Sequence, residues 1–334
     1  MDEKEKKYIY NKIDTLNSIL WENRVLKPHL EGWLNNFKKE EKDDALYLLS
    51  RCMYFGIVSI RAILRALYRD KYCSPVIQEI RRANEETLDD TVIERGFQDH
   101  LMRTRFVGVG NPSESGTHLL YYFRQENRIP KKLFVNTDDL YVLKENGTVE
   151  LRARNIDHIV FIDDLCGSGS QIKRDSNVKR CVQNLRKLKK GLKISYLMMF
   201  GTKEGINVVK NTTLIGSEIK LFDEVEAVME LNESYKCFGE HSRYFSNKGC
   251  KEKIRTMSYK YGKFLIGRRV DRNHPRMDSD KRIQRIEANA LGYGDCQLLL
   301  SLHHNTPNNT LPIIWFDEDN SVWTPIFKRY NKVY

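Results

Sequence analysis

The hydrophobic pattern of the chain, which has 334 residues, changes about a third of the way along it. Before residue 104 apolar residues recur three or four positions apart, as in Leu30, Trp33 and Leu34. Residues at this spacing fall on one face of a helix. We therefore expect residues 1–103 to form a helical N-terminal region.

From about residue 104 short apolar runs alternate with amphipathic stretches. The runs predict strands at 106–110, 132–135, 159–162, 193–200 and 219–222. Between them we expect helices at 115–127, 176–190 and 205–210. Asn146-Gly147, in the polar segment 136–154, is a hairpin turn signal. Strands that alternate with helices predict an α/β fold with a parallel sheet covered on both faces.

The stretch Ile159–Gln171 carries the chemistry that the pattern makes most specific. A short apolar strand is followed by Asp163 and Asp164, then by a loop of small residues and a predicted helix. Ligands of open α/β sheets bind at the carboxyl ends of strands, and a glycine-rich loop entering a helix presents N–H groups to a phosphate. The aspartates therefore suit a ribose diol and the loop a 5′-phosphate. The predicted phosphate-binding residues are Cys166, Gly167, Ser168, Gly169, Ser170 and Gln171.

This order of residues resembles the ribose-5-phosphate motif of the type I phosphoribosyltransferases, with Ser168-Gly169 where Thr-Gly is usual. The order of strands resembles that fold over about 104–225. The resemblance implies a type I phosphoribosyltransferase-like parallel sheet in which Asp163 and Asp164 are catalytic. It also implies Mg²⁺, which these acids hold indirectly because it bridges pyrophosphate and ribose oxygens. The first strand would lead into a pyrophosphate loop, formed by Gly110, Asn111, Ser113, Ser115 and Gly116.

The net charge of +11 lies beyond residue 100, because residues 1–100 carry 17 Lys and Arg against 18 Asp and Glu. That near-neutral balance argues against a DNA-binding helix-turn-helix around Phe55-Gly56. Lys173–Lys193 contains nine basic residues opposed only by Asp175. Such a run favours contact with a polyanion, although it is also typical of a solvated helix face. The residues that we expect to contact nucleic acid are Lys179, Arg180, Lys187, Lys190, Arg268 and Arg269.

The basic C-terminal region adds a second resemblance. Ser242–Phe245 and His304–Trp315 resemble the C-terminal part of the PRTase-CE family, which is phosphoribosyltransferase-like and found in bacterial conflict systems. This resemblance implies an effector in anti-phage loci, including retrons, with a reverse transcriptase and its RNA and DNA as a possible ribonucleoprotein partner. For His304–Thr310 both a turn held by side chains and a nucleotide-contacting loop remain open. The expected organisation is a helical region 1–103, an α/β core 104–225 and a basic region 226–334 that packs on the core.

Several other classes of protein are disfavoured. The seven cysteines form no CxxC pair, and the spacing of Cys237, His241 and Cys250 is too irregular for a standard zinc site or a disulfide framework. A G-x-x-x-x-G-K-[ST] loop does not occur, and Gly108-x-Gly110-x-x-Ser113 lacks the third glycine of a dinucleotide-binding loop. No apolar run reaches eighteen residues and the N-terminus has no signal-peptide core, so we expect a cytoplasmic protein without a membrane partner.

Two functions follow from these patterns. In the first, the chain is an enzyme that binds a ribose 5-phosphate group and acts at ribose C1 of a nucleotide or a phosphoribosyl donor. In the second, the same fold is a non-catalytic module that binds a nucleotide or nucleic acid and docks a ribonucleoprotein. Binding of a ribose phosphate is common to both.

Overall fold

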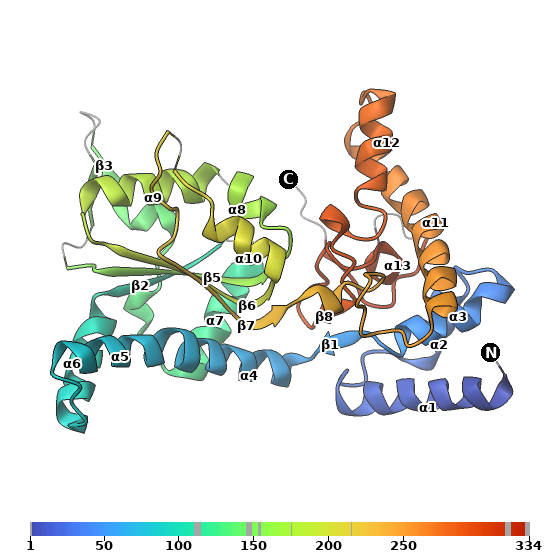
Figure 1. Cartoon of the computed structure of the whole chain (residues 1–334), viewed down its shortest axis with the longest axis horizontal. Helices are drawn as coiled ribbons and strands as arrows, with labels where there is room; N and C mark the ends of the chain where they lie inside the picture. The colour runs from blue at the N-terminus through green and yellow to red at the C-terminus, as the bar shows by residue number, and fades with distance from the viewer. Residues whose placement is uncertain are drawn as a thin grey trace. The chain divides into compact units, whose positions relative to one another are not determined.

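The computed structural model describes residues 2–109, 115–144, 149–152, 155–174, 176–214, 216–317 and 322–330 (Figure 1). The chain divides into two compact units, one combining Met1–Ile60 with Asn232–Tyr334 and the other containing Arg61–Leu231. This division differs from the three consecutive regions expected from the sequence. The N-terminal helices are shared between the units, because the first three pack with the C-terminal region in one hydrophobic core.

The unit of residues 61–231 is built on a four-stranded sheet in which all neighbouring strands are parallel. Its strands, in spatial order, are β2 (Thr104–Gly108), β5 (His158–Cys166), β6 (Lys193–Thr202) and β7 (Glu224–Leu231). The register places Phe106 beside Val160 and Phe161 beside Tyr196. β5 and β6 are buried along almost their whole length, as expected for parallel strands that are covered on both faces. The predicted α/β fold with a parallel sheet is confirmed.

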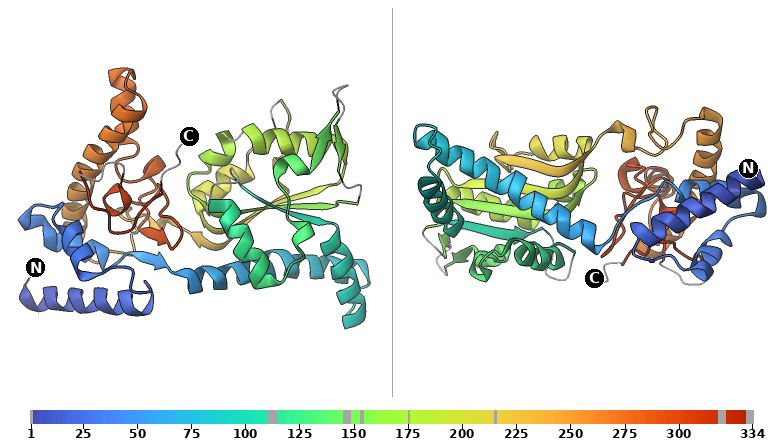
Figure 2. Two further views of the ribbon diagram at one scale, coloured as in Figure 1. Left: turned by 180° about the vertical axis from the view of Figure 1, so that it is seen from behind. Right: turned by 90° about the horizontal axis from the view of Figure 1, so that it is seen from below.

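Helices cover both faces of this sheet (Figures 1 and 2). They are α4 (Ile57–Tyr68), α5 (Ser74–Ala83), α6 (Asp90–Met102), α7 (Ser115–Asn127), α8 (Ser170–Arg174), α9 (Ser176–Leu188) and α10 (Lys203–Lys210). On one face Val182 and Leu185 of α9 join Phe161 in a single buried cluster. On the other face Phe106 packs against Phe123 of α7 and against Tyr72. The helices expected at 115–127, 176–190 and 205–210 are confirmed with small changes of boundary.

Two of the five expected strands are wrong. Segment 132–135 contains part of a 3₁₀ turn, η3 (Lys131–Leu133), and only Phe134 forms an isolated bridge with Phe106. The last strand is β7 rather than 219–222, although Leu221 and Phe222 are buried. β7 lies at the edge of the sheet and alternates polar and apolar residues, so its sequence contains no continuous apolar run of the kind that predicted the other strands.

A small antiparallel pair interrupts the unit between η3 and β5. It consists of β3 (Tyr141–Leu143) and β4 (Val149–Leu151). The pair agrees with the hairpin predicted from Asn146-Gly147, and these two turn residues lie outside the described residues.

The other unit joins the two ends of the chain. From the N-terminal side it has α1 (Glu3–Ile19), α2 (Lys27–Leu34), α3 (Lys42–Leu49) and β1 (Met53–Phe55). From the C-terminal side it has α11 (Lys248–Asn273), α12 (Ser279–Glu287), β8 (Leu300–Leu302) and α13 (Pro312–Trp315). Strand β1 pairs in parallel with β8, and the buried Trp33 indole N–H donates to the Ile313 carbonyl at 2.8 Å. A paired strand between α3 and α4 rules out the helix-turn-helix considered around Phe55-Gly56.

Candidate functional site

The two aspartates of the predicted motif lie at the carboxyl end of β5, inside the strand rather than after it. The β2 neighbour of β5 ends at the pair Gly108–Ile162, whereas pairing with β6 continues to Cys166 and Gly201. Asp163 and Asp164 therefore occupy the part of β5 that β2 leaves uncovered. Since successive side chains of a strand point to opposite faces, the two carboxyl groups lie in different surroundings.

Asp163 is the buried member of the pair, with 6% of its surface exposed. The Tyr196 hydroxyl donates to its Oδ2 at 2.6 Å, and the Asp164 backbone N–H donates to its Oδ1 at 2.8 Å. Burial, and then the charge of Asp164, raise the pKa of Asp163 well above its usual value. Burial also raises the pKa of Tyr196, so its hydroxyl keeps its proton. Asp163 is thus held under the site as a fixed support.

Asp164 is only partly buried, and its carboxyl group interacts with that of Asp163. Its Oδ1 accepts the backbone N–H of Leu165 at 2.7 Å, which fixes the carboxyl group beside the strand. A partly exposed carboxylate at the carboxyl end of a central strand is well placed to accept hydrogen bonds from a ligand. Of the two predicted catalytic residues, Asp164 is the more exposed.

The predicted anion loop follows at once. Cys166 is the last residue of β5 and is buried, Gly169 has φ +69°, and α8 begins at Ser170. The hydroxyl groups of Ser168 and Ser170 are 2.8 Å apart and both residues are partly exposed. A positive φ at Gly169 turns the chain sharply and is costly for any residue with a Cβ. Gln171 is exposed on the first turn of α8.

Helix α10 braces this loop from one side. The Thr202 hydroxyl, which caps α10 by accepting the Gly205 N–H at 2.9 Å, also donates to the Gly167 carbonyl at 2.5 Å. A Cβ at Gly205 would lie 1.9 Å from the same carbonyl oxygen. The backbone of α10 is therefore in direct contact with the backbone of the loop at Gly167. This contact holds the loop between β5 and α10 before any ligand binds.

The predicted pyrophosphate loop is described only at its edges. Gly110, Asn111 and Ser113 lie outside the described residues, Ser115 and Gly116 open α7, and nothing is described of the Ser115 side chain. On the strand side, the Val109 N–H donates to the Ile162 carbonyl at 3.1 Å. The chain thus leaves β2 directly beside the residue that precedes Asp163.

The basic residues predicted to contact nucleic acid belong to different units. In the unit of residues 61–231, Arg180, Lys187 and Lys190 are exposed, and Lys179 is partly buried with its ammonium group on the Lys173 carbonyl. Three further cations of the run form ion pairs with carboxylates: Arg186 with Asp223, Lys189 with Asp157, and Lys193 with Glu224. In the other unit, Arg268 is exposed and Arg269 lies over the Trp315 ring. The run therefore leaves a smaller exposed cationic surface than its composition suggests.

Sequence reasoning missed Tyr196, Thr202 and Gly205. Tyr196 lay within a strand that was correctly predicted, but its partner is set by the parallel register, which sequence spacing does not give. Thr202 and Gly205 could have been found as an N-cap and the third position of a helix, because threonine commonly caps helices. Their contact with Gly167 needed the fold.

Within the described ranges, no group of three or more His, Cys, Asp or Glu side chains is placed to hold a metal ion, and this includes Cys237, His241 and Cys250. Among the helices of the same ranges, none has both the length and the apolar character needed to cross a membrane.

Comparison with known proteins gives one match. The family model described as PRTase-CE matches residues 30–329, which is most of the chain and includes segments of both compact units. No curated protein and no solved structure matches.

Proposed function

The chain therefore belongs to the PRTase-CE family and is phosphoribosyltransferase-like, and from this premise we propose that it binds a ribose 5-phosphate group and acts at ribose C1. The observation that carries the proposal is the braced loop Cys166–Gln171 beside a partly exposed Asp164 at the carboxyl end of β5. The two features together match the two ends of a ribose 5-phosphate, its phosphate and its diol.

The loop supports the phosphate half of the proposal. Its hydroxyl groups, on Ser168 and Ser170, lie 2.8 Å apart, and both residues are partly exposed at the start of α8. The contact of Gly205 with Gly167 keeps the loop from moving toward α10. A loop that is already fixed loses little conformational entropy when it binds an anion.

The two aspartates would have different roles in binding the ribose diol. Asp164 would accept hydrogen bonds from the ribose hydroxyl groups and place negative charge near C1, where positive charge develops in an oxocarbenium-like transition state. Asp163 would be a positioning residue, because its carboxyl group already accepts hydrogen bonds from the Tyr196 hydroxyl and the Asp164 N–H. Through that second hydrogen bond it fixes the backbone from which Asp164 projects.

Mg²⁺ fits this site only at Asp164. Magnesium keeps several waters and takes few protein carboxylates when phosphates are present. The partly exposed Asp164 suits such a water-mediated contact, whereas Asp163 is 6% exposed and already accepts two hydrogen bonds. When bound, the ion would neutralise charge on a leaving pyrophosphate.

The reaction class follows from the donor. With a phosphoribosyl donor, the C1–O bond breaks, its electron pair leaves with pyrophosphate, and a nitrogen of the acceptor forms the new bond to C1 and releases its proton to solvent. With a nucleotide, the C1–N bond breaks, the base leaves with the electron pair and takes up a proton, and water supplies the new C1–O bond. We favour a nucleotide-consuming effector of anti-phage defence, as the family resemblance implies.

A binding module remains a second candidate because of one observation. Arg180, Lys187 and Lys190 are exposed and form no ion pair with the described carboxylates of the chain. Exposed cations of this kind bind nucleic-acid phosphates without sequence preference. In this function the ribose 5-phosphate site would hold a nucleotide without chemistry, and the basic face would dock a ribonucleoprotein such as a reverse transcriptase with its RNA and DNA.

One experiment separates the two candidates. The purified protein and its Asp164→Asn variant are incubated with Mg²⁺ and a nucleotide pool, and mass spectrometry identifies the species lost and gained. We expect the wild type to release a free base or to form a ribosylated product, and the variant to lose at least a hundredfold in rate while keeping its thermal stability. Equal activity of both proteins would contradict the mechanism. Absence of turnover, with salt-dependent RNA binding that the variant retains, would favour the binding module.

A further inference from the structure

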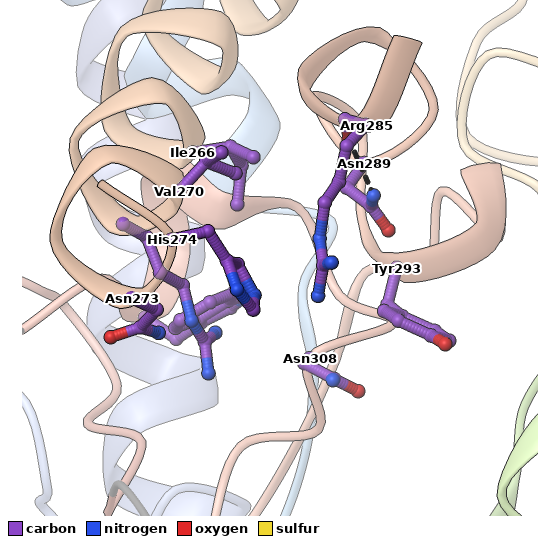
Figure 3. Close-up of a pocket in the computed structure, with 10 residues that line it drawn as sticks. Ile266, Val270, Asn273, His274, Arg285, Asn289, Tyr293 and Asn308 are labelled. Atoms are coloured by element: carbon purple, nitrogen blue, oxygen red, sulfur yellow. Dashed lines mark hydrogen bonds between the residues drawn. The ribbon is translucent and has the colours of Figure 1, made fainter. Parts of the chain in front are cut away.

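The unit formed by Met1–Ile60 and Asn232–Tyr334 contains a cavity of about 160 Å³ that has no part in the site described above (Figure 3). One wall is a single face of α11, on which Arg269 and Asn273 lie one turn apart. The facing wall is α12 and the turn after it, with Arg285 and Asn289. Tyr293, Asn308 and the buried Trp315 close the remaining sides.

Close backbone contacts hold these walls in place. A Cβ at Gly262 of α11 would lie 1.9 Å from the Ala290 carbonyl oxygen, so α11 and the turn after α12 are in direct backbone contact. Gly292 has φ +103°, and a Cβ there would lie 2.3 Å from the Asn309 carbonyl oxygen. Arg282 of α12 also pairs with Asp271 of α11 through two hydrogen bonds. The cavity is therefore formed before any ligand enters.

The polar side chains that line the cavity include two arginines, beside the apolar Ile266 and Val270 of α11. Arg285 extends into the space between α11 and the loop of Asn308 (Figure 3), and unlike Arg282 it pairs with no carboxylate of the described residues. Arg269 adds a second guanidinium group, whose face rests 5.6 Å from the centre of the Trp315 ring. None of the ten described residues that line the cavity is acidic.

The polar neighbours of the two arginines suit the rest of a ligand. Asn308 and Asn273 offer amide groups that both donate and accept hydrogen bonds, and Tyr293 offers ring surface, whereas the buried Trp315 ring already lies beneath Arg269 and Arg329. The Asn289 amide is already used, because it donates to the Arg285 carbonyl at 2.6 Å and accepts the Gly294 N–H at 3.1 Å. Paired guanidinium groups are the usual partners of phosphate oxygens, which they bind with several N–H groups at once.

We propose that this cavity binds a small phosphate monoester, with the phosphoryl group at Arg269 and Arg285 and the organic part against Tyr293. The size supports a small ligand, since a cavity of about 150 Å³ accommodates a molecule the size of benzene. A nucleic-acid strand is disfavoured, because only its terminal phosphate could enter such a space. The inference does not depend on the function proposed for the unit of residues 61–231.

The proposal is tested by isothermal titration of the full chain with phenyl phosphate, and with phenol as the uncharged control. We expect binding of phenyl phosphate and not of phenol. Arg285→Ala should weaken the affinity at least tenfold, and Arg285 is exposed, so its removal should leave the thermal melt unchanged. Arg268→Ala is the matched control, because Arg268 lies on the same helix but does not line the cavity, and it should bind like the wild type.

Asn308→Asp gives a second, nearly isosteric test because it places a carboxylate in the cavity. It should weaken phenyl phosphate binding more than Arg285→Ala does. The proposal is overturned if the wild type does not bind, or if neither Arg285→Ala nor Asn308→Asp changes the affinity. It is also overturned if a 5′-phosphorylated oligonucleotide binds through Arg285 much more tightly than phenyl phosphate, since the ligand would then be a nucleic-acid end. Gly205→Ala, which alters only the other unit, should leave this binding intact.

Discussion

Replacement of Gly205 by alanine probes how the anion loop is supported. The added Cβ would lie 1.9 Å from the Gly167 carbonyl oxygen, 2.8 Å from its carbonyl carbon and 3.0 Å from the Cys166 carbonyl oxygen. Real Cβ atoms essentially never approach other atoms closer than 3.0 Å, so backbone must move by about 1 Å. All three atoms are backbone, and no flexible side chain can absorb the shift. Either the loop moves away from α10 or the first turn of α10 opens.

The size of the effect follows from two opposing contributions. Alanine in place of a helical glycine normally stabilises a protein by about 0.4–1 kcal/mol, whereas overpacking of a close contact costs about 1–3 kcal/mol. Loss of the hydrogen bond from Thr202 to Gly167 would add to the cost. We expect a net destabilisation of about 1–3 kcal/mol in urea unfolding. Displacement of the loop by about 1 Å should also weaken ribose 5-phosphate binding at least tenfold.

Gly32→Ala is the matched control. Gly32 also lies inside a helix, and a Cβ there would meet only Thr324 Cγ2 at an ordinary 3.5 Å. This variant should be as stable as the wild type or more stable, and should bind ribose 5-phosphate normally. The reasoning is refuted if Gly205→Ala matches Gly32→Ala in both unfolding free energy and ribose 5-phosphate affinity, as measured by urea titration and calorimetry.

Two further predictions concern the buried groups. Folding raises the pKa of Asp163 above its unfolded value of 3.8. Its contribution to the free energy of unfolding is therefore complete below pH 3.8 and is lost as the pH rises, because the carboxyl group loses its proton more easily in the unfolded chain. The free energy of unfolding of Asp163→Asn, minus that of the wild type, should therefore be larger at pH 7.5 than at pH 4.5 in urea unfolding. An equal difference at both pH values would mean that the pKa of Asp163 is not raised by folding. Trp33→Ala should cost about 3–5 kcal/mol because the indole is fully buried against the C-terminal segment. By hydrogen exchange we expect faster exchange in β8 and α13 with β5 and β6 unchanged, and acceleration in β5 as well would show that the two units unfold together.

Much of the unit of residues 61–231 was determined by local sequence. The apolar run of β5, the amphipathic face of α9 and the order of small residues after Asp164 each act within a dozen residues, so pattern and propensity were enough to find them. Edge strand β7 was missed because half of its side chains face away from the core. The type of site was predictable because a strand, an acidic pair and a glycine loop are contiguous in the chain.

What the tertiary structure alone decided depends on contacts between distant segments. Asp163 and Asp164 are chemically identical in the sequence, and only the fold buries Asp163 against the Tyr196 hydroxyl and leaves Asp164 partly exposed. The contact of Gly205 with Gly167 likewise joins a loop to a helix that follows it only after two helices and a strand. The union of Met1–Ile60 with Asn232–Tyr334, and with it the cavity between α11 and α12, arises because neither end of the chain can bury its apolar surface alone.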